Sequence, residues 1–212
     1  MELRLHRGGR FRAWLGARLG GDAELGNRAW RRILHALAAA VLVYYILPNG
    51  FFVIVPKEVV LGAGLAALVI LEILRHTVGV QLPTLRPYEE GRVASYVFLA
   101  LAFVGAIVLF PQPIAVAVVL GTAFVDPIAG EVRGRPQLYP GLPLVAYFIL
   151  ALAGLWAIGG WPFLPSAGLA VGAAILAVLA ERPKLPWLDD DLLMTFAPAL
   201  FLYAVGVLLL AL

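Results

Sequence analysis

Long apolar runs separated by short polar clusters are the feature that most constrains how this chain can fold. An α-helix needs about 20 apolar residues to cross the hydrocarbon core of a bilayer. Of the 212 residues, 62% are hydrophobic and 14% are charged, which is far more apolar than an ordinary soluble domain. The sequence therefore predicts an all-α integral membrane protein, a bundle of about seven transmembrane helices. The expected spans are 35–55, 58–75, 93–110, 113–133, 142–159, 163–181 and 192–212.

The charged residues predict the orientation of the bundle. With the amino terminus cytoplasmic, all 16 Lys and Arg residues except Lys57, and all 13 Asp and Glu residues except Glu58, fall on the inner side. The arginines before position 33 fit the positive-inside rule better than a nucleic-acid partner, which is not expected. We predict a cytoplasmic basic arm at 1–32, either an interfacial helix or a frayed tail, and a polytopic domain at 33–212. Acidic residues on the same side indicate a charged reaction centre on the cytoplasmic face of a cell membrane.

Several kinds of chemistry are excluded by what the sequence lacks. The chain has no cysteine, so disulfides and thiol-ligated metals are excluded, and its last expected span has no lysine for a retinal Schiff base. Walker, protein-kinase and zincin motifs are also missing. The glycine pairs Gly62 with Gly64 and Gly168 with Gly172 predict close helix packing, because no strand precedes them as a dinucleotide site requires.

Polar clusters stand at the inner ends of the first three expected spans. Arg32 and His35 open the first span, either as phosphate ligands or as ordinary interfacial residues. Glu72 and Arg75 are spaced i, i+3 near the end of the second span, so they can pair, either within a functional site or as a structural ion pair. The acidic loop before the third span carries Arg92 at its end.

The most informative cluster is an Asp-Pro step inside the fourth expected span, at Asp126 and Pro127. Because proline disfavours helix at the residue before it, we expect a broken span in which Asp126 caps a new half-helix. Such a helix start attracts phosphate. Glu131 and Arg133 follow at the cytoplasmic exit, with Asp126 and Arg133 on one helical face.

A final acidic cluster precedes the seventh span. It begins with Glu181 and Lys184 and ends in Asp189, Asp190 and Asp191. Aspartates at a helix start are ordinary capping residues, but they also suit Mg²⁺, which is usually held by carboxylates together with substrate phosphates.

Taken together, these clusters resemble the CTP-dependent lipid kinase family of dolichol kinase, phytol kinase and yeast-type diacylglycerol kinase, over most of the chain. The family usually has Gly-Asp where this chain has Val125-Asp126, and its Asp-Asn falls on Asp190-Asp191. The Gly-Lys-Ser segment expected after the first element is missing, since Gly134 leads almost directly into Pro140. The matching elements are Arg31-Arg32-x-x-His35, Glu72-x-x-Arg75, Arg86-x-x-Glu89-Glu90-Gly91-x-x-x-Ser95-Tyr96, Asp126-Pro127 and Asp189-Asp190-Asp191.

The resemblance implies a kinase that transfers a phosphoryl group from CTP, or another nucleoside triphosphate, to a lipid alcohol such as a dolichol or polyprenol, geranylgeraniol or phytol, or diacylglycerol. Mg²⁺ or another divalent cation is the expected cofactor. The alternatives are a CTP-dependent lipid-phosphate cytidylyltransferase and a non-catalytic transporter, although the outer half shows no polar pathway. The expected residues are Asp126, Glu72 and Glu131 for catalysis, Arg32, His35, Arg75, Arg92, Arg133 and Lys184 for nucleotide and phosphates, and Asp189, Asp190 and Glu181 for metal.

Overall fold

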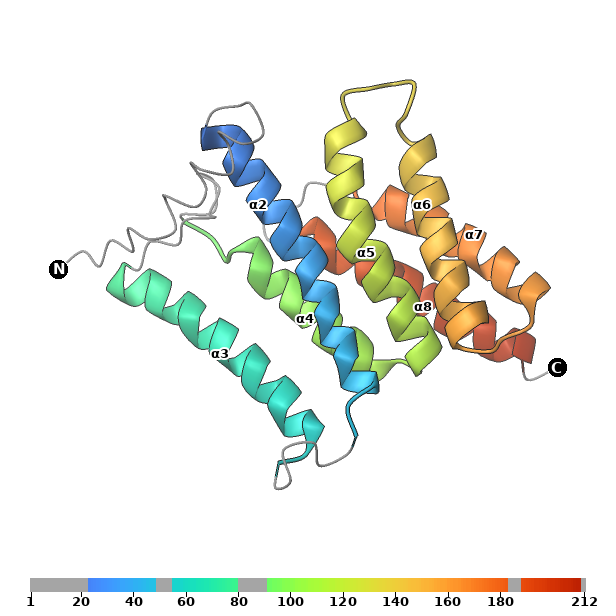
Figure 1. The fold of residues 1–212 in the computed structure, drawn as a ribbon, viewed down its shortest axis with the longest axis horizontal. Coiled ribbons are helices and arrows are strands. Elements are labelled where there is room, and N and C mark those ends of the chain that lie inside the picture. The colour runs from blue at the N-terminus through green and yellow to red at the C-terminus, as the bar shows by residue number, and fades with distance from the viewer. Residues whose placement is uncertain (1–22, 49–54, 80–90, 183–187, 211–212) are drawn as a thin grey trace.

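The computed structural model describes residues 23–48, 55–79, 91–182 and 188–210, and within these ranges it contains helices and no strand (Figure 1). Consecutive helices run antiparallel (Figure 1). This confirms the all-helical prediction. The elements are α2 (Ala23–Ala38) with its 3-10 continuation η1 (Ala39–Tyr45), α3 (Lys57–Val78), α4 (Ser95–Leu109), α5 (Gln112–Val132), α6 (Gly141–Leu152) with its π-helical continuation η3 (Ala153–Ile158), α7 (Phe163–Ala180) and α8 (Asp190–Leu210).

Membrane-spanning character is clearest in the middle of the chain. Within the described ranges, three helical segments are long and apolar enough to cross a membrane: α5, α6 with η3, and α7. Their mean hydropathies are 1.7, 2.1 and 2.1, while α4 is apolar but only 15 residues long. Within the described ranges every expected span overlaps a helical segment, which agrees with the predicted number of helices.

The first expected span differs most from the structure. We expected it to begin at residue 35, but α2 begins at Ala23, and the boundary drawn at residue 32 falls inside this helix. Alanine, leucine and arginine are strong helix formers, and they extend an amphipathic helix into the polar part of the sequence. Hydropathy alone detects only the apolar part of such a helix. Residues 1–22 of the expected arm lie outside the described residues.

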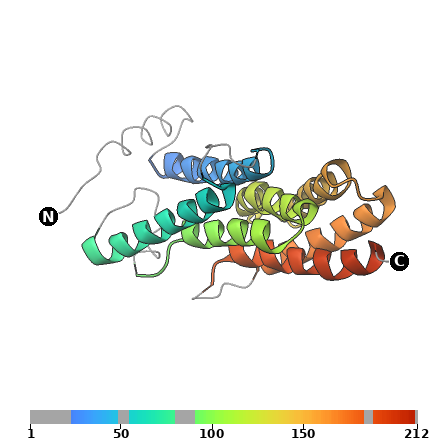
Figure 2. The same cartoon turned by 90° about the horizontal axis from the view of Figure 1, so that it is seen from below.

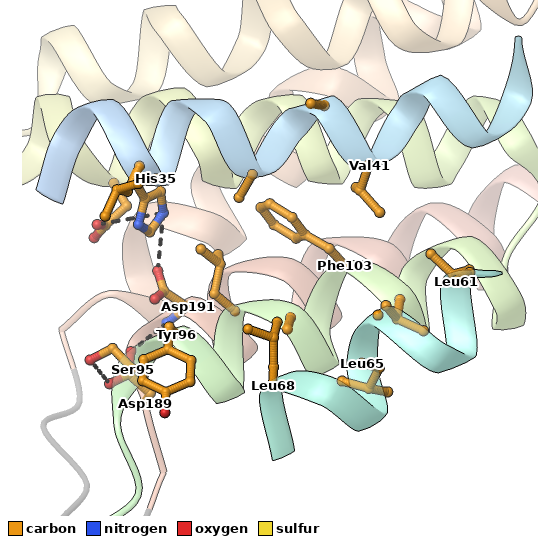
Figure 3. Close-up of a pocket in the computed structure, with 18 of the residues that line it drawn as sticks. His35, Val41, Leu61, Leu65, Leu68, Ser95, Tyr96, Phe103, Asp189 and Asp191 are labelled. Atoms are coloured by element: carbon orange, nitrogen blue, oxygen red, sulfur yellow. Dashed lines mark hydrogen bonds and ion pairs between the residues drawn. The ribbon is translucent and has the colours of Figure 1, made fainter. Parts of the chain in front are cut away.

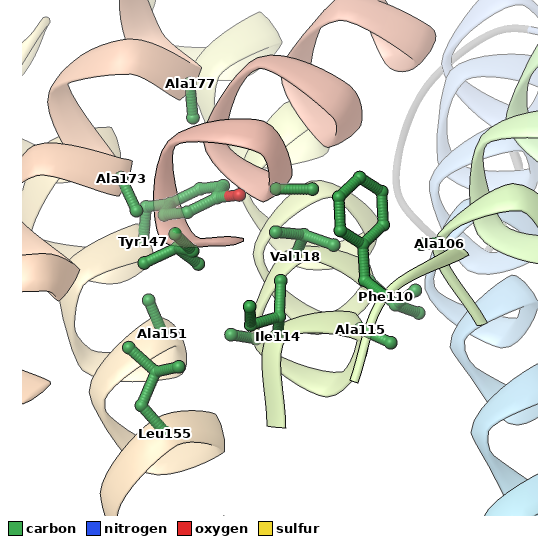
Figure 4. Close-up of a cluster of buried hydrophobic side chains, with 14 of the residues drawn as sticks. Ala106, Phe110, Ile114, Ala115, Val118, Tyr147, Ala151, Leu155, Ala173 and Ala177 are labelled. Carbon is green, nitrogen blue, oxygen red and sulfur yellow. The ribbon is translucent and has the colours of Figure 1, made fainter. Parts of the chain in front are cut away.

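Helix α5 is the centre of the bundle, because it packs against α2, α4, α6 and α8. Ile114 and Val118 of α5 lie in one apolar cluster with Tyr147 and Leu155 of α6 and η3 (Figure 4). All four side chains are fully buried. The position of α5 therefore fixes where the polar side chains of its last two turns lie, Asp126 and Glu131 among them.

The expected break at Pro127 is wrong, because α5 continues from Gln112 to Val132 with Pro127 inside it. Asp126 is therefore a residue of an unbroken helix and does not cap a new one. The conformational preference that proline imposes on its predecessor is modest, and apolar packing along the rest of α5 maintains the helix.

A second internal proline shows how such a helix compensates for the missing hydrogen bond. Pro198 of α8 has no N–H, so the carbonyl of Met194 lacks its usual partner in the helix. The hydroxyl of Tyr147 donates to that carbonyl oxygen at 3.4 Å. Tyr147 reaches it because it packs on Gly121, where an added Cβ would lie 2.5 Å from the ring. Gly121, Tyr147 and Pro198 thus lock α5, α6 and α8 together.

Helix α3 lies at the periphery, next to α4 (Figures 1 and 2). Close packing at Gly62 and Gly64 was predicted but is wrong within the described chain, since an added Cβ at either position would meet nothing within 4 Å. Gly168 is equally open, whereas a Cβ at Gly172 would lie 2.4 Å from the ring of Phe201. A glycine favours close packing only where a neighbouring helix presents a side chain that fills the space.

Candidate functional site

Charged side chains from different helices meet at one end of the bundle. Ion pairs there join α2 to α5 and α8, through Arg32 with Glu131 and His35 with Asp191. At the opposite end, the Tyr44 hydroxyl donates to Glu58 at 3.1 Å and Lys57 lies over the Tyr44 ring. The prediction that most ionisable residues share one end is therefore confirmed for the described residues. The segment that carries Lys184 lies outside them.

The centre of this end is formed by His35 of α2, Asp126 of α5 and Asp191 of α8. Figure 3 shows the imidazole of His35 facing the carboxylate of Asp191. His35 Nε2 lies 3.4 Å from Asp191 Oδ1 and 3.9 Å from Asp126 Oδ2. One ligand atom from each of the three residues falls within 4.8 Å of the others. Three elements far apart in the sequence thus place one imidazole and two carboxylates around a common point.

A hydrogen bond one turn deeper fixes the two carboxylates relative to each other. Thr122 precedes Asp126 by four residues on α5, and Thr195 follows Asp191 by four residues on α8, so each threonine shares a face with its aspartate. The two threonine hydroxyls are 3.0 Å apart, and Thr195 also donates to the Asp191 carbonyl oxygen at 2.8 Å. Both threonines are fully buried. This bond sets the separation of α5 and α8 directly beneath the site.

Asp189 lies beside the central cluster and binds the start of α4. The Ser95 hydroxyl donates to Asp189 Oδ2 at 2.9 Å, and Arg92 Nη2 lies 3.5 Å from the same oxygen. Burial and the neighbouring Asp190 raise the pKa of the Asp189 carboxyl above its usual value, against the opposing effect of the Ser95 hydrogen bond. Asp189 therefore connects the loop before α8 to α4.

Glu72 and Arg75 form the ion pair predicted from their spacing, but the pair is structural in character. Arg75 donates from Nε and Nη2 to the Glu72 carboxylate at 2.8 and 2.7 Å, and both residues are buried. Glu72 also accepts the Ala94 amide at 2.9 Å and the Tyr96 hydroxyl at 2.7 Å. Arg75 donates to the Arg92 carbonyl oxygen at 2.6 Å. These contacts fasten the end of α3 to the start of α4, so neither residue is assigned to catalysis or phosphate binding.

The remaining predicted acids are also held by basic partners. Arg32 pairs with Glu131, and about half of each side chain is exposed, at 40% and 48%. Arg133 pairs with the fully buried Glu181, which also accepts a hydrogen bond from Tyr139 at 3.3 Å. Glu181 was predicted as a metal ligand with Asp189 and Asp190, but within the described chain these three do not form a cluster of potential ligands. The fold turns Glu181 toward Arg133 instead.

The charged end opens into a cavity of about 910 Å³ whose two parts differ in polarity (Figure 3). His35 and the aspartates lie at one end, and apolar side chains of η1, α3 and α4 line the remainder. Such a cavity suits a ligand with a polar head and a long apolar tail. Its polar lining includes Arg31, Arg32, His35, Asp126, Arg133, Asp189, Asp190 and Asp191, and its apolar lining includes Val41, Leu61, Leu65, Leu68, Phe103 and Val104.

The structure separates the predicted site residues that it describes into two groups. The residues that line the cavity are Arg32, His35, Asp126, Arg133, Asp189 and Asp190. The residues that are not part of its lining are Glu72, Arg75, Arg92, Glu131 and Glu181. Sequence reasoning did not select Asp191 as a ligand, although it is 4% exposed and completes the central cluster. Asp191 and Thr195 are four residues apart, as are Thr122 and Asp126. This repeated pairing of an aspartate with a threonine on one helix face is a sequence signal that could have identified Asp191.

Comparisons of the chain with protein-family models, with curated proteins and with solved structures found no match.

Proposed function

We propose that this protein is a membrane lipid kinase, which transfers the terminal phosphoryl group of CTP or another nucleoside triphosphate to a lipid alcohol. The observation that carries this proposal is that one cavity has both a charged end and an apolar end. An alcohol with its chain along Leu61, Leu65 and Leu68 would place its hydroxyl near Asp126 and Asp191. A water-soluble substrate gains nothing from the apolar part of such a site.

The reaction follows from the groups around the charged end. The lipid hydroxyl oxygen attacks the terminal phosphorus, the bond from that phosphorus to the bridging oxygen breaks, and the nucleoside diphosphate leaves with that oxygen. Asp126 is the group proposed to orient the hydroxyl and accept its proton. Arg31, Arg32 and Arg133 supply positive charge to the phosphates, in place of the missing Gly-Lys-Ser segment. A divalent cation held by the aspartates of the charged end would neutralise phosphate charge.

The orientation in the membrane belongs to the same proposal. We infer seven spans, with the amino terminus and the charged end of the bundle facing the cytoplasm, where nucleotides are available. The concentration of basic side chains at that end supports this orientation through the positive-inside rule. Cysteines introduced at 50 and 88 test it, because the native chain has none. Labelling of both from the same side would contradict it.

The chemistry is tested with two differently labelled nucleotides. Purified protein in detergent is incubated with a panel of lipid alcohols and with CTP or ATP that carries ³²P in the γ position or the α position. Kinase activity moves the γ label into lipid and leaves the α label in the nucleoside diphosphate. A lipid-phosphate cytidylyltransferase would instead move the α label into lipid phosphates. If neither CTP nor ATP labels any of the lipid alcohols or lipid phosphates, the kinase proposal is contradicted and a transport role is favoured.

A further inference from the structure

We infer that His35, Asp126 and Asp191 form a binding site for a first-row transition-metal ion, such as Mn²⁺, in preference to Mg²⁺. A role for this ion in phosphoryl transfer rests on the proposed function. Binding of the ion does not, because it follows from the geometry of the three side chains. The inferred ligands also differ from the carboxylates that the sequence predicted, Asp189, Asp190 and Glu181.

The spacing of the three side chains matches an ion. Metal–ligand distances of about 2.1 Å keep neighbouring ligand atoms about 3 to 4 Å apart. His35 Nε2 lies 3.4 Å from Asp191 Oδ1 and 3.9 Å from Asp126 Oδ2. All three ligand atoms lie within 4.8 Å of one another. A small rotation of the Asp126 side chain would therefore bring them to the spacing that a bound ion requires.

An independent observation points to an ion at this position. Asp191 is 4% exposed, and its Oδ1 atom, which faces His35, accepts no hydrogen bond within the described part of the chain. A buried carboxylate oxygen without a hydrogen bond is costly, and coordination of a cation removes the cost.

The imidazole determines which ion is preferred. Mg²⁺ is held by oxygen ligands and seldom accepts a histidine nitrogen, whereas imidazole with carboxylates suits first-row transition metals. The alternative is a charged His35 that pairs with Asp191 and only joins α2 to α8. In that case, an added metal would not change the stability of the protein.

Mn²⁺ is a suitable probe because its magnetism reports directly on a coordinated nitrogen. Full-length, nucleotide-free protein in detergent is stripped with chelator and titrated with MnCl₂ at fixed ionic strength. Free Mn²⁺ is measured by electron paramagnetic resonance, and coupling to nitrogen is measured in pulsed experiments. We expect bound Mn²⁺ with nitrogen coupling, a rise in melting temperature, and no displacement by an equal concentration of Mg²⁺.

Variants identify the ligands. Replacement of His35 by Gln should abolish the nitrogen coupling and weaken Mn²⁺ binding by at least about tenfold, and Asp126→Asn and Asp191→Asn should weaken it similarly. The control is His76→Gln, since His76 lies 3.3 Å from Glu72 in the α3 ion pair and should leave binding unchanged. Melting in chelator shows whether each variant is folded.

Three outcomes would overturn the inference. The first is no Mn²⁺ binding by the native protein. The second is that Mn²⁺ binds elsewhere: its nitrogen coupling then survives His35→Gln, or its binding is lost when Asp190 is replaced but not when Asp126 or Asp191 is replaced. The third is displacement by Mg²⁺ at equal concentration. If His35→Gln fails to fold, nitrogen coupling in the native protein together with loss of affinity in Asp126→Asn decides the question. Because no turnover is measured, Mn²⁺ binding can be established even if the lipid kinase proposal fails.

Discussion

The two halves of this bundle, α2 to α4 and α5 to α8, differ in how closely their helices pack. In α5 to α8, large side chains fill the space above some glycines, as Tyr147 does on Gly121 and Phe201 on Gly172, although Gly168 is open. On α3, by contrast, Gly62 and Gly64 both face open space, and Gly64 lines the cavity. The comparison teaches that an apolar helix bundle becomes compact only where large and small residues face each other. Where they do not, the bundle retains room for a ligand.

The largest expected effect tests whether the cavity holds the chemistry, because Asp126 of α5 lines its charged end. Asp126→Asn should slow lipid phosphorylation at least about 100-fold, because it removes the charge that orients the hydroxyl while it keeps the shape. The melting temperature should stay close to that of the native protein. Turnover and melting are measured on the same detergent preparation, with Glu58→Gln at the opposite end as the control. Normal turnover would remove Asp126 from the site.

The second prediction compares one glycine from each half. Gly154→Ala should lower the free energy of unfolding by about 3 kcal/mol, because the new Cβ would lie 2.7 Å from the Ala117 Cα, and backbone cannot move aside easily. Gly64→Ala should be neutral or stabilising by about 1 kcal/mol, since alanine favours helix and the space is open. Thermal unfolding of both variants measures the difference. Equal destabilisation would contradict the contrast between the halves.

A third prediction fills the cavity. Gly64→Phe should leave folding intact but reduce turnover with long-chain alcohols by roughly tenfold, which corresponds to about 1.4 kcal/mol. Nucleotide binding should be unchanged, because Gly64 lies on α3 among the apolar lining residues. Turnover with alcohols of graded length, set beside nucleotide titration, is the measurement. A larger loss for short chains than for long ones would place the lipid elsewhere.

The smallest expected effect compares two tyrosine hydroxyls. Tyr147→Phe leaves the Met194 carbonyl oxygen in the interior without its donor, so the free energy of unfolding should fall by about 1 kcal/mol. Tyr44→Phe removes an exposed bond to Glu58 and should have almost no effect. Chemical or thermal unfolding in one detergent gives both values. Equal losses would show that burial does not distinguish the two bonds.

Much of the fold was predictable from sequence, because apolar run length determines where helices form. Periodicity also predicted the contact of Glu72 with Arg75, which lie on one helix face. The meeting of His35, Asp126 and Asp191 was not predictable as a cluster, since it depends on how three separate helices are rotated about their axes. The continuity of α5 through Pro127 was missed because a local preference was given more weight than packing. Spacing within one helix is readable from sequence, whereas rotation between helices is set by the whole core.

The peripheral position of α3 has a consequence for how such a protein can diversify. The groups proposed for chemistry stand on α2, α5 and α8, whereas α3 contributes much of the apolar wall and is fastened to α4 through Glu72 and Arg75. Changes of side-chain size along the inner face of α3 would alter which lipid chain fits without moving the reacting groups. Selectivity for the lipid chain and reactivity at the charged end would then evolve as separate traits. A library of variants at residues 60–68 would change the selectivity for the lipid chain alone.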